Sequence, residues 1–337
     1  MSDELWQDKP LVLPWLKGRW DYLLELKTQN RFPHALLING PEGIGKACFA
    51  MALANYVLCR SPQGNTACGH CRSCELTRSG GHPDLYLLKP DDPGKPIKID
   101  QVRELTTFIY STAQQGGYRV VIIDPADSMN INAANALLKM LEEPGEQTLI
   151  MLLTHRLGQM LPTIKSRCQR VDMPPADVAL ATQWVSTQLQ VESAEAAQLL
   201  VIAHHSPLQA LAYKQDDLLG LRAKVLKGLA DILKSRRSAV DVAQSLYKED
   251  LELLLGWLYS WIVDIARSAE NQADPEILRH TDARNMLLAL ARKVNHQKLY
   301  CFADQVQVAR KELMLRHNLN KQLLMEKLLS EWYSLAR

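Results

Sequence analysis

Short apolar runs alternate with helical periodicity through the first half of the chain. Four runs predict buried strands: HALLING, DLYLLKP, YRVVIID and TLIMLLT, which end at residues 40, 90, 124 and 154. Between them, the stretches 46–60, 98–114 and 130–144 carry apolar side chains three and four positions apart, which predicts helices. Asp100 is the expected N-cap of the second helix, and Pro144 ends the third. This alternation predicts a parallel sheet covered by helices on both faces.

The pattern changes after RVDMPP, because the remaining sequence is helically periodic with almost no strand signal. The changes near Pro174-Pro175 and near Gln215-Asp216 predict three domains: residues 1–173, 174–214 and 215–337. An apolar stripe near the end suits either the core of the last domain or a contact with another subunit. Its members are Leu319, Leu323, Met325, Leu328, Leu329 and Trp332.

Composition narrows the class of protein. Of 337 residues, 47% are hydrophobic, which is enough for substantial cores. The formal net charge of +2 gives no global basic field for nucleic acid, although it leaves room for a locally basic face. No run of 18 apolar residues exists, and the first ten residues, MSDELWQDKP, are polar and unlike a signal peptide. We therefore expect a cytoplasmic protein with reduced thiols and no membrane partner.

The segment GPEGIGKA matches the phosphate-binding pattern G-x-x-x-x-G-K-[ST] except at its last position. In such a loop, backbone N–H groups point at the phosphates and the lysine reaches the β- and γ-phosphates. The residues that fit these roles are Gly40, Gly43, Gly45 and Lys46. Ala47, however, lacks the hydroxyl that usually binds Mg²⁺. Two interpretations stay open: weak binding of ATP or ADP, or a glycine turn that holds no nucleotide.

The run RVVIIDPAD should supply the acidic part of a nucleotide site. Asp124 ends the predicted strand, but the next position, where a P-loop ATPase of this kind needs a base for the attacking water, is Pro125. Proline has neither a carboxylate nor an N–H. Asp127 lies three residues beyond the strand, which is a less suitable position. Because Mg²⁺ ligation at Ala47 and water activation at Pro125 are lost independently, the sequence predicts a chain that does not hydrolyse ATP by itself.

Four cysteines lie between the first predicted helix and the second strand. They have the spacing C-x8-C-x2-C-x2-C and are Cys59, Cys68, Cys71 and Cys74. Four thiolates suit tetrahedral Zn²⁺, and each C-x-x-C can supply two ligands from one turn. With all four positions filled by sulfur, the predicted site is structural. The other three cysteines, Cys48, Cys168 and Cys301, are expected to be ordinary buried thiols.

Arg167, in the segment TIKSRC, lies just before the first predicted domain boundary. An arginine in such a place is usually a surface charge or the partner of a carboxylate. In ring-shaped ATPases an arginine here instead reaches the γ-phosphate held by a neighbouring subunit. Spacing alone does not decide between these interpretations.

Together these segments resemble the clamp-loader branch of the AAA+ family. The resemblance covers residues 34–170 and is carried, in the expected order, by HALLINGPEGIGK, the four-cysteine insert, GHPDLYLL followed by IKIDQVREL, NAANALLKMLEEP and TIKSRC. It implies an α/β AAA+ domain with a parallel sheet, a small all-α lid and an all-α collar that holds a five-subunit ring together. The helical remainder is compatible with that lid and collar.

The resemblance also implies roles and partners. It implies a non-hydrolytic stator subunit of bacterial DNA polymerase III, in a ring with ATP-hydrolysing γ/τ subunits and a δ subunit, acting on the sliding clamp and primed DNA. Arg167 would complete a neighbour's ATP site in trans, and Thr154 matches the first nucleotide-sensing position. The second sensor, normally an arginine, is missing from AHHSPLQAL. In that segment, His204 and His205 are expected at a helix end or at the surface.

Two other functions stay open at this point. One is an autonomous γ-like ATPase, which would need Mg²⁺ ligation without a hydroxyl at Ala47. The other is a zinc-bearing nucleic-acid-binding module. Against it, CGHCRSC contains only Arg72 as a permanent cation and no aromatic residue that could stack on a base.

Overall fold

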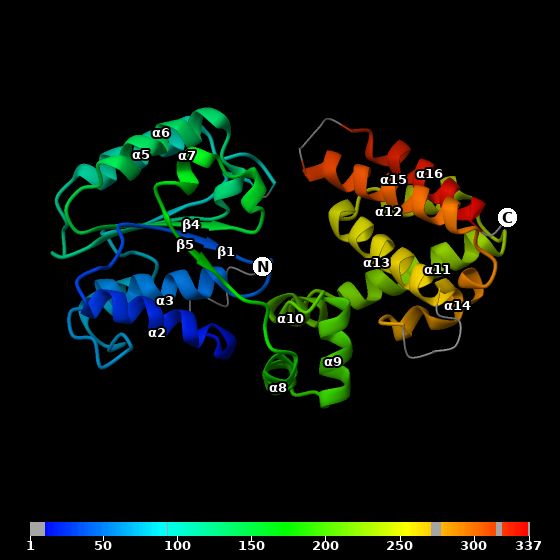
Figure 1. Cartoon of the computed structure of the whole chain (residues 1–337), viewed down its shortest axis with the longest axis horizontal. Coiled ribbons are helices and arrows are strands. Elements are labelled where there is room, and N and C mark those ends of the chain that lie inside the picture. Colours follow the sequence, from blue (N-terminus) through cyan, green and yellow to red (C-terminus); the bar gives the residue numbers. More distant parts are fainter. Residues whose placement is uncertain (1–10, 93, 271–277, 315–318, 336–337) are drawn as a thin grey trace. The chain divides into compact units, whose positions relative to one another are not determined.

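The computed structural model describes residues 11–92, 94–270, 278–314 and 319–335, so the polar N-terminal segment 1–10 lies outside the described residues. The chain divides into two compact units, with the division between Ala212 and Tyr213 (Figure 1). None of the helices within the described ranges is both long and apolar enough to cross a membrane.

The first unit contains a five-stranded parallel sheet in the order β2-β3-β4-β1-β5. The strands are β1 (Ala35–Asn39), β2 (Leu85–Leu88), β3 (Arg119–Ile123), β4 (Thr148–Thr154) and β5 (Gln169–Asp172). The four apolar runs form β1 to β4, as predicted. The sequence pattern does not predict β5, a short and largely polar strand that pairs only with β1 at the edge of the sheet.

Helices cover both faces of the sheet, which confirms the predicted parallel α/β class. In Figure 1, α2 (Lys17–Thr28) and α3 (Lys46–Leu58) lie on one face, and α5 (Ile99–Tyr110) and α6 (Ile131–Glu142) on the other. The short helices α4 (Arg72–Arg78) and α7 (Pro162–Lys165) complete this region. The expected cap at Asp100 is wrong: the N-cap of α5 is Lys98, two residues earlier, and Gln101 Oε1 accepts the Lys98 N–H at 2.9 Å.

Three further helices belong wholly or mostly to the first unit. They are α8 (Val178–Leu189), α9 (Ser193–Ile202) and α10 (Pro207–Gln215), and α10 runs across the division between the units. Trp184 on α8 makes an edge-to-face contact with Trp15, at a centroid distance of 5.4 Å, which joins this helical segment to the start of the unit. A separate lid domain with boundaries at 174 and 214 therefore stays a prediction.

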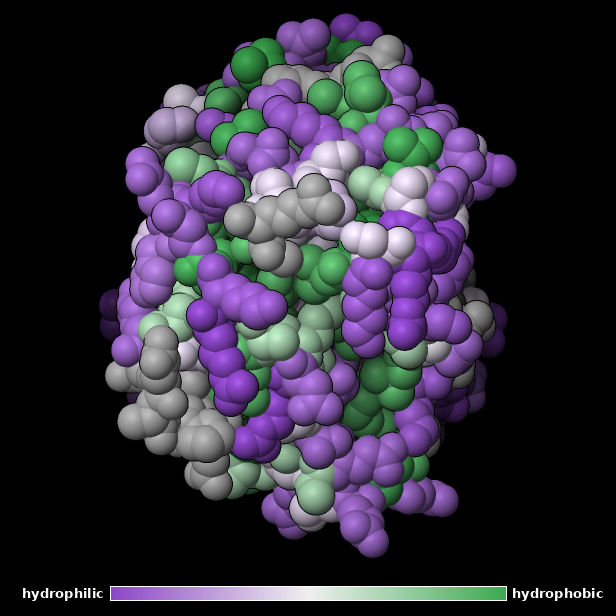
Figure 2. Space-filling model, turned by 90° about the vertical axis from the view of Figure 1, so that its right-hand side faces the viewer, coloured by the Kyte–Doolittle hydropathy of each residue, from purple (hydrophilic) through white to green (hydrophobic). Residues whose placement is uncertain are grey.

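The second unit is helical throughout its described residues, as predicted. Its helices are α11 (Leu218–Leu233), α12 (Ala239–Leu246), α13 (Leu251–Glu270), α14 (Arg284–Ala291), α15 (His296–Met314) and α16 (Lys321–Ser334). Most of the predicted apolar stripe lies in this unit's own core, since Met325, Leu328, Leu329 and Trp332 are buried, while Leu323 is 62% exposed. Figure 2 shows apolar groups gathered between charged side chains on one face of the molecule.

Candidate functional site

The glycine loop connects a strand to a helix, as a phosphate-binding loop requires. β1 ends at Asn39 and α3 begins at Lys46. Gly43 and Gly45 adopt left-handed φ angles of 70° and 99°. A Cβ on Gly45 would lie 2.3 Å from Leu13 Cδ1, so this turn needs glycine both for its conformation and for space.

Lys46 is buried and is already bonded within the loop. Its Nζ donates hydrogen bonds to Gly40 O at 2.9 Å and to Pro41 O at 2.7 Å. Burial lowers the pKa of the Lys46 ammonium, while the nearby carboxylates of Asp124 and Glu42 act in the opposite direction. These two bonds use two of the three N–H donors of the ammonium group. The predicted phosphate-binding lysine is in place, with most of its donor capacity spent on the loop itself.

The segment around residue 206 holds the loop from the outside. Ser206 Oγ donates to Glu42 O at 2.5 Å, and Leu208 N–H donates to Gly43 O at 3.0 Å. Gln209 packs tightly here, since a Cβ on Gly43 would lie 2.7 Å from Gln209 Cγ. We call Ser206, Leu208 and Gln209 the loop latch. It lies in the segment where the family resemblance implies a nucleotide-sensing arginine.

Thr154 ends β4 beside this loop, as predicted, but its hydroxyl is engaged inside the chain. It donates to Asp127 Oδ1 at 2.7 Å and accepts the Arg156 N–H at 3.0 Å. His155 Nε2 lies 3.9 Å from the other carboxylate oxygen of Asp127. Because a hydroxyl has one proton, Thr154 cannot donate to a phosphate while this bond to Asp127 persists.

The four predicted metal ligands come together at the end of α3 and the start of α4. The Sγ–Sγ distances are 3.5 Å for Cys59–Cys68, 3.9 Å for Cys59–Cys71, 3.9 Å for Cys68–Cys74 and 3.5 Å for Cys71–Cys74. A tetrahedron with zinc–sulfur bonds of about 2.3 Å has sulfur–sulfur edges of about 3.8 Å. The four sulfurs are therefore spaced to hold one metal ion.

Hydrogen bonds favour the thiolate form at Cys68, whereas burial raises the pKa of Cys59 and Cys74. The Cys68 N–H donates to Cys59 Sγ at 3.3 Å, and the Cys71 N–H donates to Cys68 Sγ at 3.4 Å. A hydrogen bond from the Ser61 side chain, together with backbone hydrogen bonds, lowers the pKa of Cys68 to about 5. Such bonds stabilise the charged form of the sulfur.

Arg167 lies after α7 and is 35% exposed at its side chain. Its Nε donates to Glu142 Oε1 at 2.8 Å, and its Nη1 donates to Thr163 O at 3.0 Å. Within this chain, Arg167 is thus the partner of a carboxylate, one of the two arrangements expected from the sequence. These contacts lie outside the glycine loop, so the structure does not bring Arg167 together with Lys46 or Thr154.

Comparison with known proteins identifies the family. A family model described as DNA polymerase III, delta subunit matches residues 17–177, and one described as DNA polymerase III, delta subunit, C terminal matches residues 216–334. The DNA polymerase III subunit delta′ of Pseudomonas aeruginosa is 38% identical over 325 residues, which cover 96% of this chain and 98% of that protein. The chain belongs to the DNA polymerase III subunit delta′ family. Membership places it among the proteins of DNA replication.

A second relative supports this family. The subunit delta′ of Escherichia coli K12 is 32% identical, over 94% of this chain and 93% of that protein. Among solved structures, a DNA polymerase III gamma subunit-related protein from Thermotoga maritima is similar, with 22% identity and a TM-score of 0.44. That match covers 94% of this chain and 99% of the solved chain.

Some residues of this region are not found by sequence reasoning alone. Asp127 is the hydrogen-bond partner of Thr154 because the turn at Ala126–Ser128 carries it back towards β4. The expectation for Cys301 is wrong, since its side chain is exposed, whereas Cys48 and Cys168 are buried as expected. His204 and His205 follow the end of α9, as predicted.

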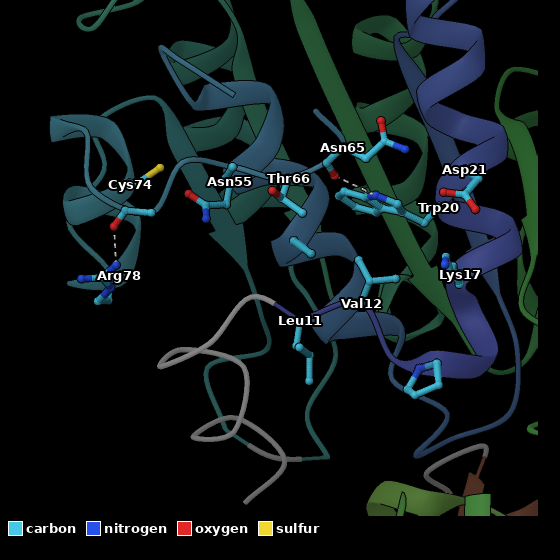
Figure 3. Close-up of a pocket in the computed structure, with 14 residues that line it drawn as sticks. Leu11, Val12, Lys17, Trp20, Asp21, Asn55, Asn65, Thr66, Cys74 and Arg78 are labelled. Carbon is cyan, nitrogen blue, oxygen red and sulfur yellow. Dashed lines mark hydrogen bonds between the residues drawn. The ribbon is translucent and has the colours of Figure 1, made fainter. Parts of the chain in front are cut away.

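A groove lies between the cysteine insert and the first helices, with a volume of about 780 Å³. Figure 3 shows its walls, with Lys17 and Trp20 from α2, Asn55 from α3, and Cys74 and Arg78 from α4. The indole Nε1 of Trp20 donates to Asn65 O at 3.0 Å, so the insert is bonded to α2 across this groove.

A buried hydrogen-bond network connects the insert to the sheet. Ser73, next to Cys74, donates from Oγ to Leu58 O at 2.7 Å. His82 Nδ1 accepts the Asp84 N–H at 3.0 Å, so its Nε2 must carry the proton that is donated to Ser73 Oγ, 2.7 Å away. The serine proton points away from the histidine, and the histidine ring accepts from a backbone N–H of Asp84 instead of donating to its carboxylate. Ser73, His82 and Asp84 therefore have the composition of a catalytic triad but the hydrogen-bond direction of a structural network.

The same network predicts a pH dependence of stability. Burial lowers the pKa of His82 below its ordinary value of 6.5. The unfolded chain therefore takes up a proton first as the pH falls, and the free energy of unfolding decreases between pH 6.5 and the lower folded pKa. Urea unfolding at pH values from about 7.5 to about 5.5 measures this slope. His82→Gln should reduce this slope and leave the part due to His155, whose pKa burial also lowers. His296→Gln, at an exposed position, should leave the slope unchanged; equal slopes in all three proteins would contradict the assignment.

Proposed function

We propose that this chain is a non-hydrolytic subunit of a clamp-loader complex, and that it helps a neighbouring subunit to hydrolyse ATP. In this proposal, Arg167 enters the neighbour's ATP site, where a guanidinium stabilises the charge that develops on the transferred phosphate. The chain's own glycine loop acts as a fixed structural element that binds ATP or ADP weakly or not at all. The names of the delta′ relatives support a place in the DNA polymerase III assembly.

One contrast carries the proposal. In the chain's own loop, Ala47 offers no Mg²⁺ ligand, Pro125 offers no base, and the Thr154 proton is bonded to Asp127. Arg167, by comparison, is partly exposed, and its main contacts in the described part of the chain are a surface ion pair and a carbonyl. Exposed pairs of this kind contribute about 0–1 kcal/mol, so the pair with Glu142 offsets little of the attraction between the guanidinium and a partner's phosphate.

The proposed partners follow from that role. They are the γ/τ and δ subunits of a hetero-pentameric ring, with the sliding clamp and primed DNA reached through the assembly. The described surface of the cysteine insert gives little support to the alternative of nucleic-acid readout by the insert itself. Arg72 on it lies 3.9 Å from Glu75, which offsets its charge.

Zn²⁺ is the proposed ion of the four-cysteine cluster. Four thiolates and no oxygen or nitrogen ligand favour Zn²⁺ over hard cations, and a cluster with no open position suits a structural role. Cys59 extends from the end of α3 and Cys74 lies within α4, so the ion would join the insert to the helix that begins at Lys46.

The proposal is tested in a complex reconstituted from this chain and its candidate γ/τ and δ subunits. Arg167→Ala is expected to lower ATP turnover stimulated by clamp and primed DNA, because the site next to this chain loses its arginine. Assembly, followed by size-exclusion chromatography, should persist. Turnover equal to that of the unchanged complex would refute the role of Arg167 in trans.

The isolated chain provides the control for the alternative function. With Mg²⁺ present, we expect no ATP turnover above that of the buffer. Clear turnover that disappears in Lys46→Ala would instead identify an autonomous γ-like ATPase, and the proposed division of labour would be wrong.

A further inference from the structure

Glu142 and Thr163 hold the Arg167 side chain from two sides. Glu142 is the last residue of α6, and its Oε1 accepts from Arg167 Nε at 2.8 Å and lies 2.5 Å from Arg167 Nη2. On the other side, Arg167 Nη1 donates to Thr163 O at 3.0 Å and lies 3.5 Å from Ser166 Oγ. The guanidinium plane is therefore fixed by contacts at three of its nitrogens.

These contacts leave the outer edge of the guanidinium available. Arginine carries five N–H donors in a rigid planar fork. Glu142 takes the side of the fork formed by Nε and Nη2, and Thr163 takes one donor of Nη1. Nη1 also contacts Ser166 Oγ at 3.5 Å, a long and weak bond that a phosphate oxygen can replace. One N–H on each terminal nitrogen can therefore serve a phosphate.

Glu142 and Thr163, which hold Arg167, are next to residues of the hydrophobic core. Leu141, next to Glu142, and Ile164, next to Thr163, belong to the cluster between the sheet and its covering helices, as does Cys168, next to Arg167. Their side chains are 9% exposed or less. Because these neighbours fix both backbones, the Glu142 carboxylate and the Thr163 carbonyl are already in position to bind Arg167.

We propose that Glu142 is a positioning residue for Arg167, an inference that rests on the proposed role of Arg167 in trans. A free arginine side chain samples many rotamers and loses that freedom when it reaches a phosphate. The contacts with Glu142 and Thr163 remove part of this entropy loss in advance and direct the remaining two donors outward. Misplacement of such a group lowers the rate of the chemical step rather than the binding of substrate.

A double-mutant cycle in the reconstituted complex tests this proposal. Glu142→Ala is expected to remove more than half of the ATP turnover that Arg167→Ala removes, through kcat and with an unchanged KM for ATP. Glu142→Gln keeps an oxygen that can accept from Nε and should retain most of the turnover. In the Arg167→Ala background, Glu142→Ala should add no further loss. Glu143→Ala, at the neighbouring exposed acid, is the matched control and should leave turnover unchanged.

The outcomes separate this inference from the function on which it rests. Unchanged turnover in Arg167→Ala overturns the proposed function itself. If Arg167→Ala lowers turnover but Glu142→Ala does not, the role of Glu142 is wrong and the role of Arg167 stands. If Glu142→Ala costs as much in the Arg167→Ala background as in the unchanged protein, Glu142 acts independently of Arg167, which also overturns the inference.

Discussion

Replacing Cys74 with serine is expected to release the metal of the four-cysteine cluster and to unfold the insert around it. Cys74 is 2% exposed and contacts two other sulfurs of the cluster, so three thiolates alone leave one position open. Structural zinc sites provide on the order of 10 kcal/mol of folding free energy. The net stability of a protein is itself only about 5–15 kcal/mol, so the proposed ion would supply a large part of the first unit's stability.

Metal content, thiol reactivity and melting temperature together measure the effect. The protein purified without chelators should contain one zinc per chain, and Cys74→Ser should contain none. The melting temperature of the first unit should fall by more than about 10 °C. In the intact protein, Cys301 is the exposed thiol and should react rapidly with a disulfide reagent; a chelator should then expose four more thiols.

Cys301→Ser is the matched control for this experiment. It removes an exposed thiol outside the cluster and should change the free energy of unfolding by no more than about 0.5 kcal/mol. Full metal content in Cys74→Ser would show that the cluster is not the metal site. Rapid reaction of five thiols without a chelator would lead to the same conclusion.

The sequence predicts the four apolar strands, including the edge strand β2, but not the largely polar edge strand β5. Strands β1, β3 and β4 lie between other strands and are apolar on both faces, so a continuous apolar run reveals them. Strand β5 has only β1 as a neighbour, and three of its four residues are polar. Its backbone pairing with Leu36 to Asn39 holds it in place, and pairing of this kind leaves no periodic signal in the side chains.

The candidate site divides in the same way between local and distant determinants. The cysteine cluster follows from ligand spacing, because Cys68, Cys71 and Cys74 fall within one short turn and helix. The loop latch joins positions 164 residues apart, and the Arg167–Glu142 pair joins positions 25 residues apart. Neither has a signature in the sequence, because both depend on how separate elements pack. The family resemblance predicts which residues matter, but not the partners that already occupy them.

The second unit has a buried arginine that pairs with a carboxylate, and breaking this pair is expected to lower the stability of the unit. Arg222 is 1% exposed, and its guanidinium carbon lies 4.8 Å from the ring centre of Trp261 and 5.6 Å from that of Trp257. Its Nε donates to Asp282 Oδ2 at 2.7 Å, and its Nη2 donates to Asp282 Oδ1 at 3.2 Å. This bidentate pair joins α11 to the turn before α14, and the two indoles pack near the charge.

Asp282→Ala is expected to destabilise the second unit because it leaves the Arg222 charge buried without its carboxylate. Removing one partner of a fully buried pair costs about 3–5 kcal/mol. The Asp282 side chain is 34% exposed, so water reduces the expected loss to about 2–3 kcal/mol. Hydrogen exchange of α11 and α13 amides in the full chain measures this loss locally, apart from the first unit.

The double variant separates the charge from the packing. Arg222→Met removes the cation and keeps a long apolar side chain between Trp257 and Trp261, so it should be close to neutral. In that background, Asp282→Ala should lower the free energy of unfolding only slightly, because no buried charge is left without a partner. An equal loss of protection with and without Arg222 would mean that Asp282 stabilises the turn by itself. The ion pair would then be a consequence of the packing rather than a cause of it.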